Sequence, residues 1–227
     1  DRTLLEYDAV GNATRTIDAR GNSTSFEYDA LNREVRRTDA AGHAYEKDYD
    51  AVGNLVEERL PNGNVMQTDY DGLNRATELR DSMGVLRQME YDANGNLTRE
   101  VNGRGIESLF FFDDLNQLIR SELPEGRVLL SEYDVLGNVT RETDANLNVR
   151  RFEYDLVDRL ARSYDPLDRF EENTYDGVGN LLAVTDRRNN TTTNTYDDLD
   201  QLIRVDDALL QFRTIEYDLV GNVTRTV

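Results

Sequence analysis

Carboxylates are the residues of this chain that could do chemistry. Among its 227 residues there are 45 Asp and Glu, a single histidine, His43, and no cysteine. Two carboxylates that face each other across a cleft can hydrolyse a glycosidic bond, and Asp-rich turns can bind calcium through several oxygens. Nucleophilic catalysis by a Ser–His pair would depend on His43 alone. The spacing of the carboxylates decides which of these chemistries is available.

The carboxylates follow a sequence repeat of fixed length. An aromatic residue followed by Asp occurs eleven times, each time in the same place of a 21-residue unit, and no residue is inserted or lost. A fixed period of this kind is the signature of stacked repeat units. The dipeptides are Tyr7-Asp8, Tyr28-Asp29, Tyr49-Asp50, Tyr70-Asp71, Tyr91-Asp92, Phe112-Asp113, Tyr133-Asp134, Tyr154-Asp155, Tyr175-Asp176, Tyr196-Asp197 and Tyr217-Asp218.

Successive aspartates of the repeat should lie two strand spacings apart, roughly 10 Å. This distance is too wide for a catalytic pair, and it leaves each turn short of the about six oxygens that calcium takes unless neighbouring layers contribute. We therefore interpret the aspartates as turn caps that accept backbone N–H groups, and His43 as a solvated turn histidine. The sequence predicts no catalytic residue, no metal site, no cofactor and no enzymatic activity, with calcium as the alternative left open.

Each repeat unit has the pattern of a β-hairpin. When the aromatic residue is counted as position 0, position +4 is always Gly, Asn or Asp, the residue types that best tolerate a positive φ. Asp at the start of a tight turn and a left-handed residue at its end predict a type I turn with a G1 bulge, which we call the first turn. Position +4 is occupied by Gly11, Asn32, Gly53, Asn74, Gly95, Asn116, Gly137, Asp158, Gly179, Asp200 and Gly221.

A second turn lies half a period away. Position +11 is mostly Asp, position +14 is mostly Gly, and the three prolines, Pro61, Pro124 and Pro166, all stand at +12, where the fixed φ of proline suits a turn. The segments between the turns are short and rich in Thr, Val, Leu, Tyr and Arg, which predicts strands of about five to seven residues.

The predicted fold is therefore all-β, a continuous antiparallel meander of 21-residue hairpin repeats that forms one repeat domain over residues 1–227. About 22 strands at about 4.8 Å each would make a strip about 100 Å long. Open twisted sheets seldom exceed about ten strands without curling. We expect the strip to coil into a spiral shell or tube.

Two further patterns refine this expectation. Position +5 alternates between Asn and Arg or Gln, so the true repeat is a pair of hairpins, and successive hairpins occupy different environments. Position +3 is Leu or Val in ten of eleven units, although loop tips normally face water. We predict that this apolar stripe packs against an adjacent layer, most simply the next turn of the spiral.

The bulk composition excludes several partners. A formal net charge of −19 disfavours nucleic acid and an anionic membrane surface, since both need clustered Lys and Arg. No apolar run approaches the about 20 residues of a membrane span, so we expect no membrane insertion by this segment. The chain begins in phase with the repeat and without an initiator Met, and we interpret it as a piece of a longer protein that carries the targeting signals.

The aromatic column at position 0 has two interpretations. It could stack sugars, or it could be a packing spine with aromatic pairs between strands, which we favour. Arg, which outnumbers Lys 25 to 1, makes planar pairs with carboxylates, and we expect cross-strand Arg–carboxylate networks on the sheet. The Asn-x-Ser/Thr sequons follow from Asn at +5 and a strand Thr, so we infer no glycosylation from them.

The strings Tyr49-Asp50-Ala51-Val52-Gly53-Asn54-Leu55 and Tyr70-Asp71-Gly72-Leu73-Asn74-Arg75 closely resemble the YD repeat of the Rhs family, and the resemblance covers the whole chain. The family includes bacterial Rhs polymorphic toxins, shell subunits of insecticidal toxin complexes, wall-associated bacterial proteins and animal teneurins. The resemblance implies a β-sheet that spirals into a hollow shell, which encloses a C-terminal effector in the toxins and belongs to an adhesion molecule in teneurins.

The function implied by the resemblance is a wall segment of such a shell in a secreted or cell-surface protein. Its partners would be neighbouring YD repeats of the same parent chain or assembly, and an encapsulated toxin domain. The alternatives are a cell-surface adhesion or carbohydrate-binding module and a segment of an extended YD-repeat fibre. Bacterial members also carry an Asp-Pro-x-Gly self-cleavage motif. Asp165-Pro166 is followed by Leu167 and Asp168 and lacks this Gly, so no protease activity is transferred to it.

Overall fold

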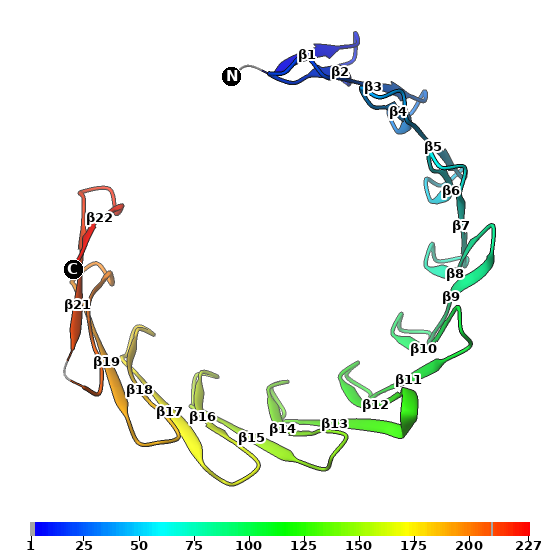
Figure 1. Ribbon diagram of the computed structural model, residues 1–227. Helices are drawn as coiled ribbons and strands as arrows, with labels where there is room; N and C mark the ends of the chain where they lie inside the picture. Colours follow the sequence, from blue (N-terminus) through cyan, green and yellow to red (C-terminus); the bar gives the residue numbers. More distant parts are fainter. Residues whose placement is uncertain (1–2, 210) are drawn as a thin grey trace. The chain divides into compact units, whose positions relative to one another are not determined.

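The computed structural model describes residues 3–209 and 211–227, and almost all of them lie in strands or hairpin turns (Figure 1). The single helical element of the described residues is one 3-10 turn, Pro124–Gly126. None of the helices in this part of the chain has the length and apolarity to cross a membrane. The all-β meander predicted from the repeat is confirmed.

The chain divides into two compact units, Asp1–Phe110 and Phe111–Val227. The first ten strands are β1 (Leu4–Tyr7), β2 (Ala13–Ile17), β3 (Ser23–Tyr28), β4 (Glu34–Thr38), β5 (Ala44–Tyr49), β6 (Leu55–Arg59), β7 (Val65–Tyr70), β8 (Ala76–Asp81), β9 (Gly84–Tyr91) and β10 (Leu97–Asn102). The strand β11 (Glu107–Phe112) spans the division. The rest are β12 (Leu118–Leu123), β13 (Arg127–Tyr133), β14 (Val139–Thr143), β15 (Val149–Tyr154), β16 (Leu160–Tyr164), β17 (Phe170–Tyr175), β18 (Leu181–Thr185), β19 (Thr191–Tyr196), β20 (Leu202–Asp206), β21 (Phe212–Tyr217) and β22 (Val223–Thr226).

Within each unit every strand pairs antiparallel with the next one in the chain. In β3 and β4, Tyr28 lies opposite Glu34 and Glu27 lies opposite Arg36, so Val35 is an unpaired extra residue. The same bulge recurs beside the first turn in ten hairpins. Bulges increase the local right-handed twist of a sheet, so the bulges in these ten hairpins supply curvature at regular intervals.

The predicted left-handed turn residues are confirmed. Position +4 has a positive φ in all eleven units, between 60° at Asp200 and 108° at Gly179. In the first turn of the second repeat, Asn32 N–H donates to the carbonyl of Asp29 and Asp29 N–H donates to the carbonyl of Arg33, which is the pattern of a type I turn with a G1 bulge. Position +14 of the second turns also has a positive φ, except that Leu210 lies outside the described residues.

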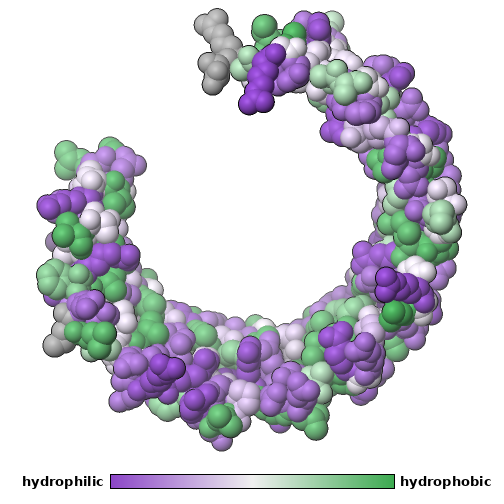
Figure 2. All heavy atoms as spheres, in the orientation of Figure 1, coloured by the Kyte–Doolittle hydropathy of each residue, from purple (hydrophilic) through white to green (hydrophobic). Residues whose placement is uncertain are grey.

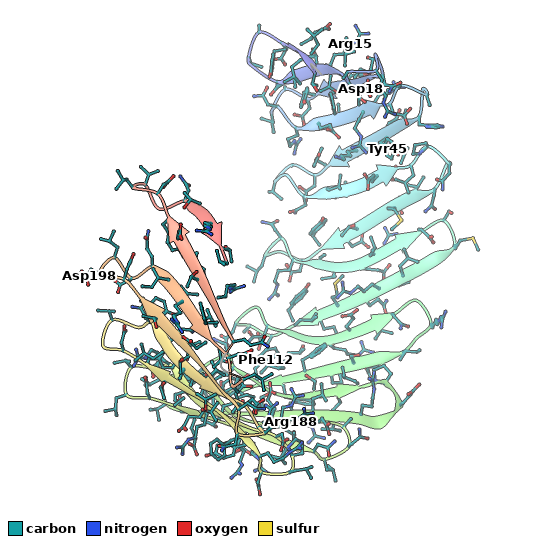
Figure 3. The ribbon with its side chains drawn as sticks, turned by 60° about the vertical axis from the view of Figure 1, so that its left-hand side comes forward. Arg15, Asp18, Tyr45, Phe112, Arg188 and Asp198 are labelled. Carbon is teal, nitrogen blue, oxygen red and sulfur yellow. The ribbon has the colours of Figure 1, made fainter. Side chains whose placement is uncertain are left out.

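The strands form a single layer, and neither unit has a closed hydrophobic core. Among the described residues no hydrophobic side chain is buried, and only Ser121 falls in the buried class. Side chains project from the sheet without a second layer across them (Figure 3), and hydrophobic and hydrophilic residues are mixed over the visible surface of both units (Figure 2). A sheet is normally stabilised by packing one face on another element. In this protein the links between neighbouring hairpins must therefore provide a larger share of the stability.

One face of the sheet carries a charge ladder, as the arginine content predicts. Glu27, Arg36 and Glu46 stand in register on three successive strands, and the guanidinium of Arg36 lies 4.0 Å from Glu27 and 3.8 Å from Glu46. In the second unit Arg162 pairs with Glu172 in the same way. Exposed pairs of this kind contribute little individually, so the ladder sets register more than it adds stability.

Candidate functional site: the first-turn edge

The first turns lie in a row along one edge of the strip, and each is organised by its Asp. In the third repeat, Asp50 Oδ1 accepts the backbone N–H of Val52 at 3.0 Å and that of Asn54 at 2.8 Å. The Asp in each of the eleven first turns accepts the same two N–H groups, from positions +3 and +5. These are the turn caps that the sequence predicts, and their lone pairs face the turn rather than a substrate.

In nine of the eleven caps the pKa of the Asp carboxyl is lowered. The pKa of the Asp71 carboxyl is lowered because the Arg75 side chain and then the Arg75 backbone N–H hydrogen-bond to it. At Asp29 the backbone N–H of Arg33 is the largest cause of a lowered pKa. A carboxylate that accepts several N–H bonds is stabilised in its ionised form. A catalytic acid would need the opposite shift.

In every second repeat the residue at +5 is Asn, and it links two first turns. Asn54 Nδ2 donates to its own cap, Asp50 Oδ2, at 2.8 Å and also to Asn74 Oδ1 of the next turn at 3.0 Å. The same link joins Asn12 to Asn32, Asn138 to Asp158 and Asn180 to Asp200. The side chain at +4 in the receiving turn must therefore supply an acceptor, which Asn and Asp do and Gly does not.

In three of the intervening repeats the residue at +5 is Arg, and it makes a different link. Arg33 Nε and Nη2 lie 2.7 Å from Asp29 Oδ2, Nη1 donates to the carbonyl of Asp50 at 3.3 Å, and the guanidinium carbon lies 4.5 Å from the centre of the Tyr49 ring. Arg75 and Arg159 repeat this arrangement over the next aromatic residue. One arginine thus caps its own turn and holds the next one.

The turn that follows an Arg or Gln at +5 has Gly at +4. Gly53 has a φ of 105°, and a Cβ there would lie 3.8 Å from Arg33 Nη1. At Gly137 the corresponding distance, to Gln117 Nε2, is 3.2 Å, closer than ordinary van der Waals contact. The alternation between successive hairpins therefore has a physical basis: Asn donates to an Asn or Asp turn, whereas the longer Arg or Gln side chain lies close to the Gly of the next turn at Gly53, Gly95, Gly137 and Gly221.

The aromatic residue at position 0 provides a third link. Tyr49 OH donates to the carbonyl of Glu34, 15 residues earlier, at 3.0 Å. The ladder between β4 and β5 ends at Arg36 and Glu46, so this carbonyl lies beyond the last paired residues. Nine tyrosines make the same bond. An unsatisfied part-buried carbonyl is costly, and the hydroxyl satisfies it where strand pairing stops.

The expected aromatic pairs between strands are absent from the column. The single ring pair of the described residues, Tyr164 with Phe170 at 5.6 Å, involves neither a position-0 ring nor a first turn. Rings two strands apart are separated by about 10 Å, which exceeds the range of about 4.5–7 Å for aromatic pairs. Arginines occupy part of this space instead, and the tyrosines act through their hydroxyls.

The remaining candidate residues are not brought together. His43 Nδ1 lies 2.9 Å from Asp39 Oδ2 at the tip of a second turn, exposed to solvent. Asp165 Oδ1 accepts the backbone N–H groups of Leu167 and Arg169, so its carboxylate caps the turn that contains Asp165-Pro166. In the described residues no group of three or more His, Cys, Asp or Glu is arranged to hold a metal ion.

The apolar stripe at +3 is exposed in this chain. Its exposed fractions range from 65% at Val157 to 82% at Val220. Within the described residues no layer covers the stripe, so the packing that the sequence predicts stays a prediction. The residues that sequence reasoning did not assign are the +5 side chains and the Tyr hydroxyl, and the alternation at +5 was the signal that pointed to the former.

The chain matches the RHS Repeat family over residues 7–44, 49–82, 70–107, 112–149 and 175–210. No curated protein matches it. Among solved structures it is similar to that of TcdB2-TccC3-TEV, with a TM-score of 0.77 and 17% identity over 97% of this chain, and to that of TcdB2-TccC3, with a TM-score of 0.71 and 18% identity over 97%. It is also similar to the Tc holotoxin pore of Photorhabdus luminescens, with a TM-score of 0.57 and 17% identity over 99%. The chain spans 14–16% of the length of these proteins.

Proposed function

The chain belongs to the RHS repeat family, and we propose that it is a stretch of wall in a hollow β-shell that encapsulates a toxin or effector domain of a secreted bacterial protein. At the coarser level the chain is a structural repeat module. The proposed partners are neighbouring repeats of the same parent and the enclosed domain, and the proposed location is outside the cell or on its surface. The similarity to the solved toxin proteins supports this proposal through the fold.

The observation that carries the proposal is the set of side-chain links between neighbouring first turns within each unit. Every second link is an Asn bridge such as Asn54 to Asn74, and the alternate links include Arg33, which lies on Tyr49. A sheet without a closed core is flexible unless its neighbouring hairpins are linked to one another. These ties make a strip that holds its curvature, which is the mechanical property that a wall needs.

We propose that the first-turn edge has a mechanical role and not a catalytic one. The cap carboxylates accept backbone N–H groups, and the pKa is lowered in nine of the eleven, which favours their ionised form. General acid catalysis needs a raised pKa and a free lone pair directed at a substrate. We propose that the segment contributes shape and mechanical strength, and that any activity of the parent belongs to other parts of it.

The unbroken spacing of the repeat also favours a second function, a segment of an extended fibre or adhesion module. A closed shell needs irregular units at its ends, and no unit of this chain contains an insertion. The two functions differ in what the strip surrounds. A shell protects an internal domain, whereas a fibre leaves each hairpin accessible from both faces.

Protease protection of the full-length parent tests the proposal. A parent lacking residues 112–195, which are four complete hairpins, is the matched control because the repeat stays in phase after the deletion. We expect a hollow particle in electron micrographs and an internal domain that resists protease in the parent and is degraded in the deletion variant. A flexible chain in which every repeat is cleaved would contradict encapsulation and leave adhesion as the better account.

A further inference from the structure

Asparagine followed by glycine occurs three times in this chain, and the three dipeptides differ in their hydrogen bonds. In such a dipeptide the backbone nitrogen of the glycine can attack the side-chain carbonyl of the asparagine, because glycine has no side chain to shield that nitrogen and the freest backbone of all residues. The folded structure decides whether the nitrogen is available for this attack. The dipeptides are Asn62-Gly63, Asn94-Gly95 and Asn102-Gly103.

In two of the three dipeptides the glycine nitrogen is already used. Gly63 N–H donates to the carbonyl of Leu60 at 2.9 Å, and Gly95 N–H donates to the carbonyl of Asp92 at 3.2 Å. Both bonds close a hairpin turn, and an attack by either nitrogen requires that its bond be broken first. Folding therefore protects the asparagines that precede these two glycines.

The third dipeptide has a free nitrogen and a free leaving group. Asn102 is the last residue of β10 and stands at +11, where most of the second turns have Asp. Neither Gly103 N–H nor Asn102 Nδ2 donates a hydrogen bond to a described residue. Both residues are exposed, and both line a hollow of about 480 Å³ that water can enter. The nucleophile and the group that it would displace are therefore both accessible.

The side-chain carbonyl of Asn102 is also polarised by the turn. Its Oδ1 accepts the backbone N–H of Arg104 at 2.9 Å and that of Ile106 at 3.2 Å. When a nucleophile adds to Cγ, negative charge develops on this oxygen, and two fixed N–H donors stabilise that charge as the donors of an oxyanion hole do. The same two bonds hold the side chain in one orientation against the turn, which lowers the entropic cost of the attack.

Packing requires a glycine after Asn102. A Cβ on Gly103 would lie 2.8 Å from the carbonyl oxygen of Val85 and 3.2 Å from the Cα of Leu86, both backbone atoms of β9. A side chain at this position would displace the backbone of the neighbouring strand, because close-packed backbone atoms have no room to move apart. The sheet therefore keeps the reactive pair of residues together.

We propose that Asn102 is a self-modification site, at which the turn converts its own asparagine to a carboxylate. Gly103 N forms a bond to Asn102 Cγ, the bond from Cγ to Nδ2 breaks, and ammonia leaves with the proton of the Gly103 N–H. Water then opens the resulting succinimide. Breaking the bond from Cγ to the Gly103 nitrogen yields aspartate, and breaking the bond from the backbone carbonyl carbon of residue 102 to that nitrogen yields isoaspartate.

The two products have opposite effects on the hairpin of β10 and β11. Aspartate at this position supplies the charged cap of the other second turns, such as Asp18, whose Oδ1 accepts the N–H groups of Arg20 and Asn22 at 2.8 Å. Hydrogen bonds to a carboxylate are stronger than those to a neutral amide. Isoaspartate instead inserts a methylene group into the backbone, so the turn loses the geometry on which its hydrogen bonds depend.

The rates at the three dipeptides, compared within one molecule, test the proposal. The chain is incubated in mildly alkaline buffer, folded or unfolded in urea, and peptide mass spectrometry follows the mass gain that accompanies conversion of amide to acid. In the folded chain Asn102 should react at least tenfold faster than Asn62 and Asn94, a difference of about 1.4 kcal/mol in the barrier. In urea the three rates should be similar, because the folded contacts are lost. Equal rates in the folded chain, or a slower reaction at Asn102, would overturn the site.

Transfer of the dipeptide to another turn is the second test. Asp144 Oδ1 accepts the same two N–H groups, from +13 and +15. Asp144→Asn with Ala145→Gly should therefore gain the reaction, whereas Asp144→Asn alone should react at least tenfold more slowly. A folded double variant that does not react would count against the mechanism. Asn102→Asp carries the first product and should have a higher urea midpoint than the unaltered chain; a lower midpoint would contradict the effect assigned to that product.

Discussion

The guanidinium of Arg33 lies 4.5 Å from the centre of the Tyr49 ring, and this contact is a side-chain link between two hairpins whose strands β4 and β5 are paired. The same arginine forms two short contacts with Asp29. We expect Arg33→Lys to destabilise the first unit by about 1 kcal/mol, since Lys lacks the planar fork and stacks less well on a ring. Urea unfolding of the variant measures the change. Arg213→Lys, at a residue without a salt bridge in the described structure, is the control, and equal losses in both would count against the link.

Each hydrogen-bonded Tyr hydroxyl should make its own contribution to the free energy of unfolding. Tyr49→Phe leaves the carbonyl of Glu34 without its donor at 3.0 Å, so we expect a loss of about 1 kcal/mol in the free energy of unfolding. Tyr45→Phe is a matched control on the same strand, because no hydrogen bond of the Tyr45 hydroxyl is found in the described structure. Chemical denaturation of both variants gives the comparison. If the control loses as much as Tyr49→Phe, the hydroxyl link is unimportant.

Gly137 should tolerate no β-branched side chain. Its φ is 93°, and a Cβ would lie 3.2 Å from Gln117 Nε2. We expect Gly137→Val to cost more than about 1 kcal/mol from backbone strain alone. A second variant, Gly137→Val with Gln117→Ala, removes the crowding and leaves the strain, so the difference between the two thermal unfolding curves isolates the side-chain contact. Wild-type stability of the single variant would contradict the turn assignment.

Leu147 is the opposite case, because it has a φ of 64° without being Gly, Asn or Asp. A left-handed conformation costs a residue with a Cβ about 1–2 kcal/mol, part of which Gly returns through its greater freedom in the unfolded chain. We expect Leu147→Gly to stabilise the second unit by about 0.5–1 kcal/mol, visible as a higher unfolding temperature. A lower unfolding temperature would show that the exposed Leu147 side chain makes contacts that outweigh the strain.

Stability should fall steeply in acid. Desolvation raises the pKa values of the turn aspartates, but hydrogen bonds from the turn outweigh it, so nine first-turn and five second-turn carboxyls have lowered pKa values. A lowered folded-state pKa contributes stability above the unfolded value of about 3.9 and loses it as the pH falls through the folded value.

The acid effect is measured by following the urea midpoint from pH 7 to pH 2. We expect a plateau above about pH 5 and a decline below about pH 4, the region where the unfolded chain binds more protons than the folded one. Asp50→Asn should make this decline shallower, whereas Asp198→Asn, at a carboxylate without a hydrogen bond in the described structure, should leave its slope unchanged. A midpoint that does not vary with pH would refute the role of the caps.

The sequence alone was enough to predict the strands, the turn type and the Asp cap of each hairpin. Asp50 and Gly53, which begin and end one turn, determine the cap and the positive φ through contacts within that turn, so the repeat pattern predicted the turn type and strand order correctly. The prediction of aromatic pairs between strands was wrong, because position-0 rings two strands apart are too far from each other to touch. Arg33 lies on the Tyr49 ring instead. Such contacts join residues that lie in different hairpins, whose side-chain directions no local pattern specifies.

What the sequence determined, then, is the repeated element, because turn chemistry and strand alternation act over a few neighbouring residues. Only the tertiary structure decided how one element holds the next. It placed Asn54 between Asp50 and Asn74, directed the Tyr49 hydroxyl to a carbonyl beyond the end of the ladder, and left the stripe that includes Leu136 uncovered. These outcomes depend on the bulges beside the first turns of ten hairpins and on the twist that they add. Bulge and twist set the distances between hairpins, which the residues of a single hairpin do not specify.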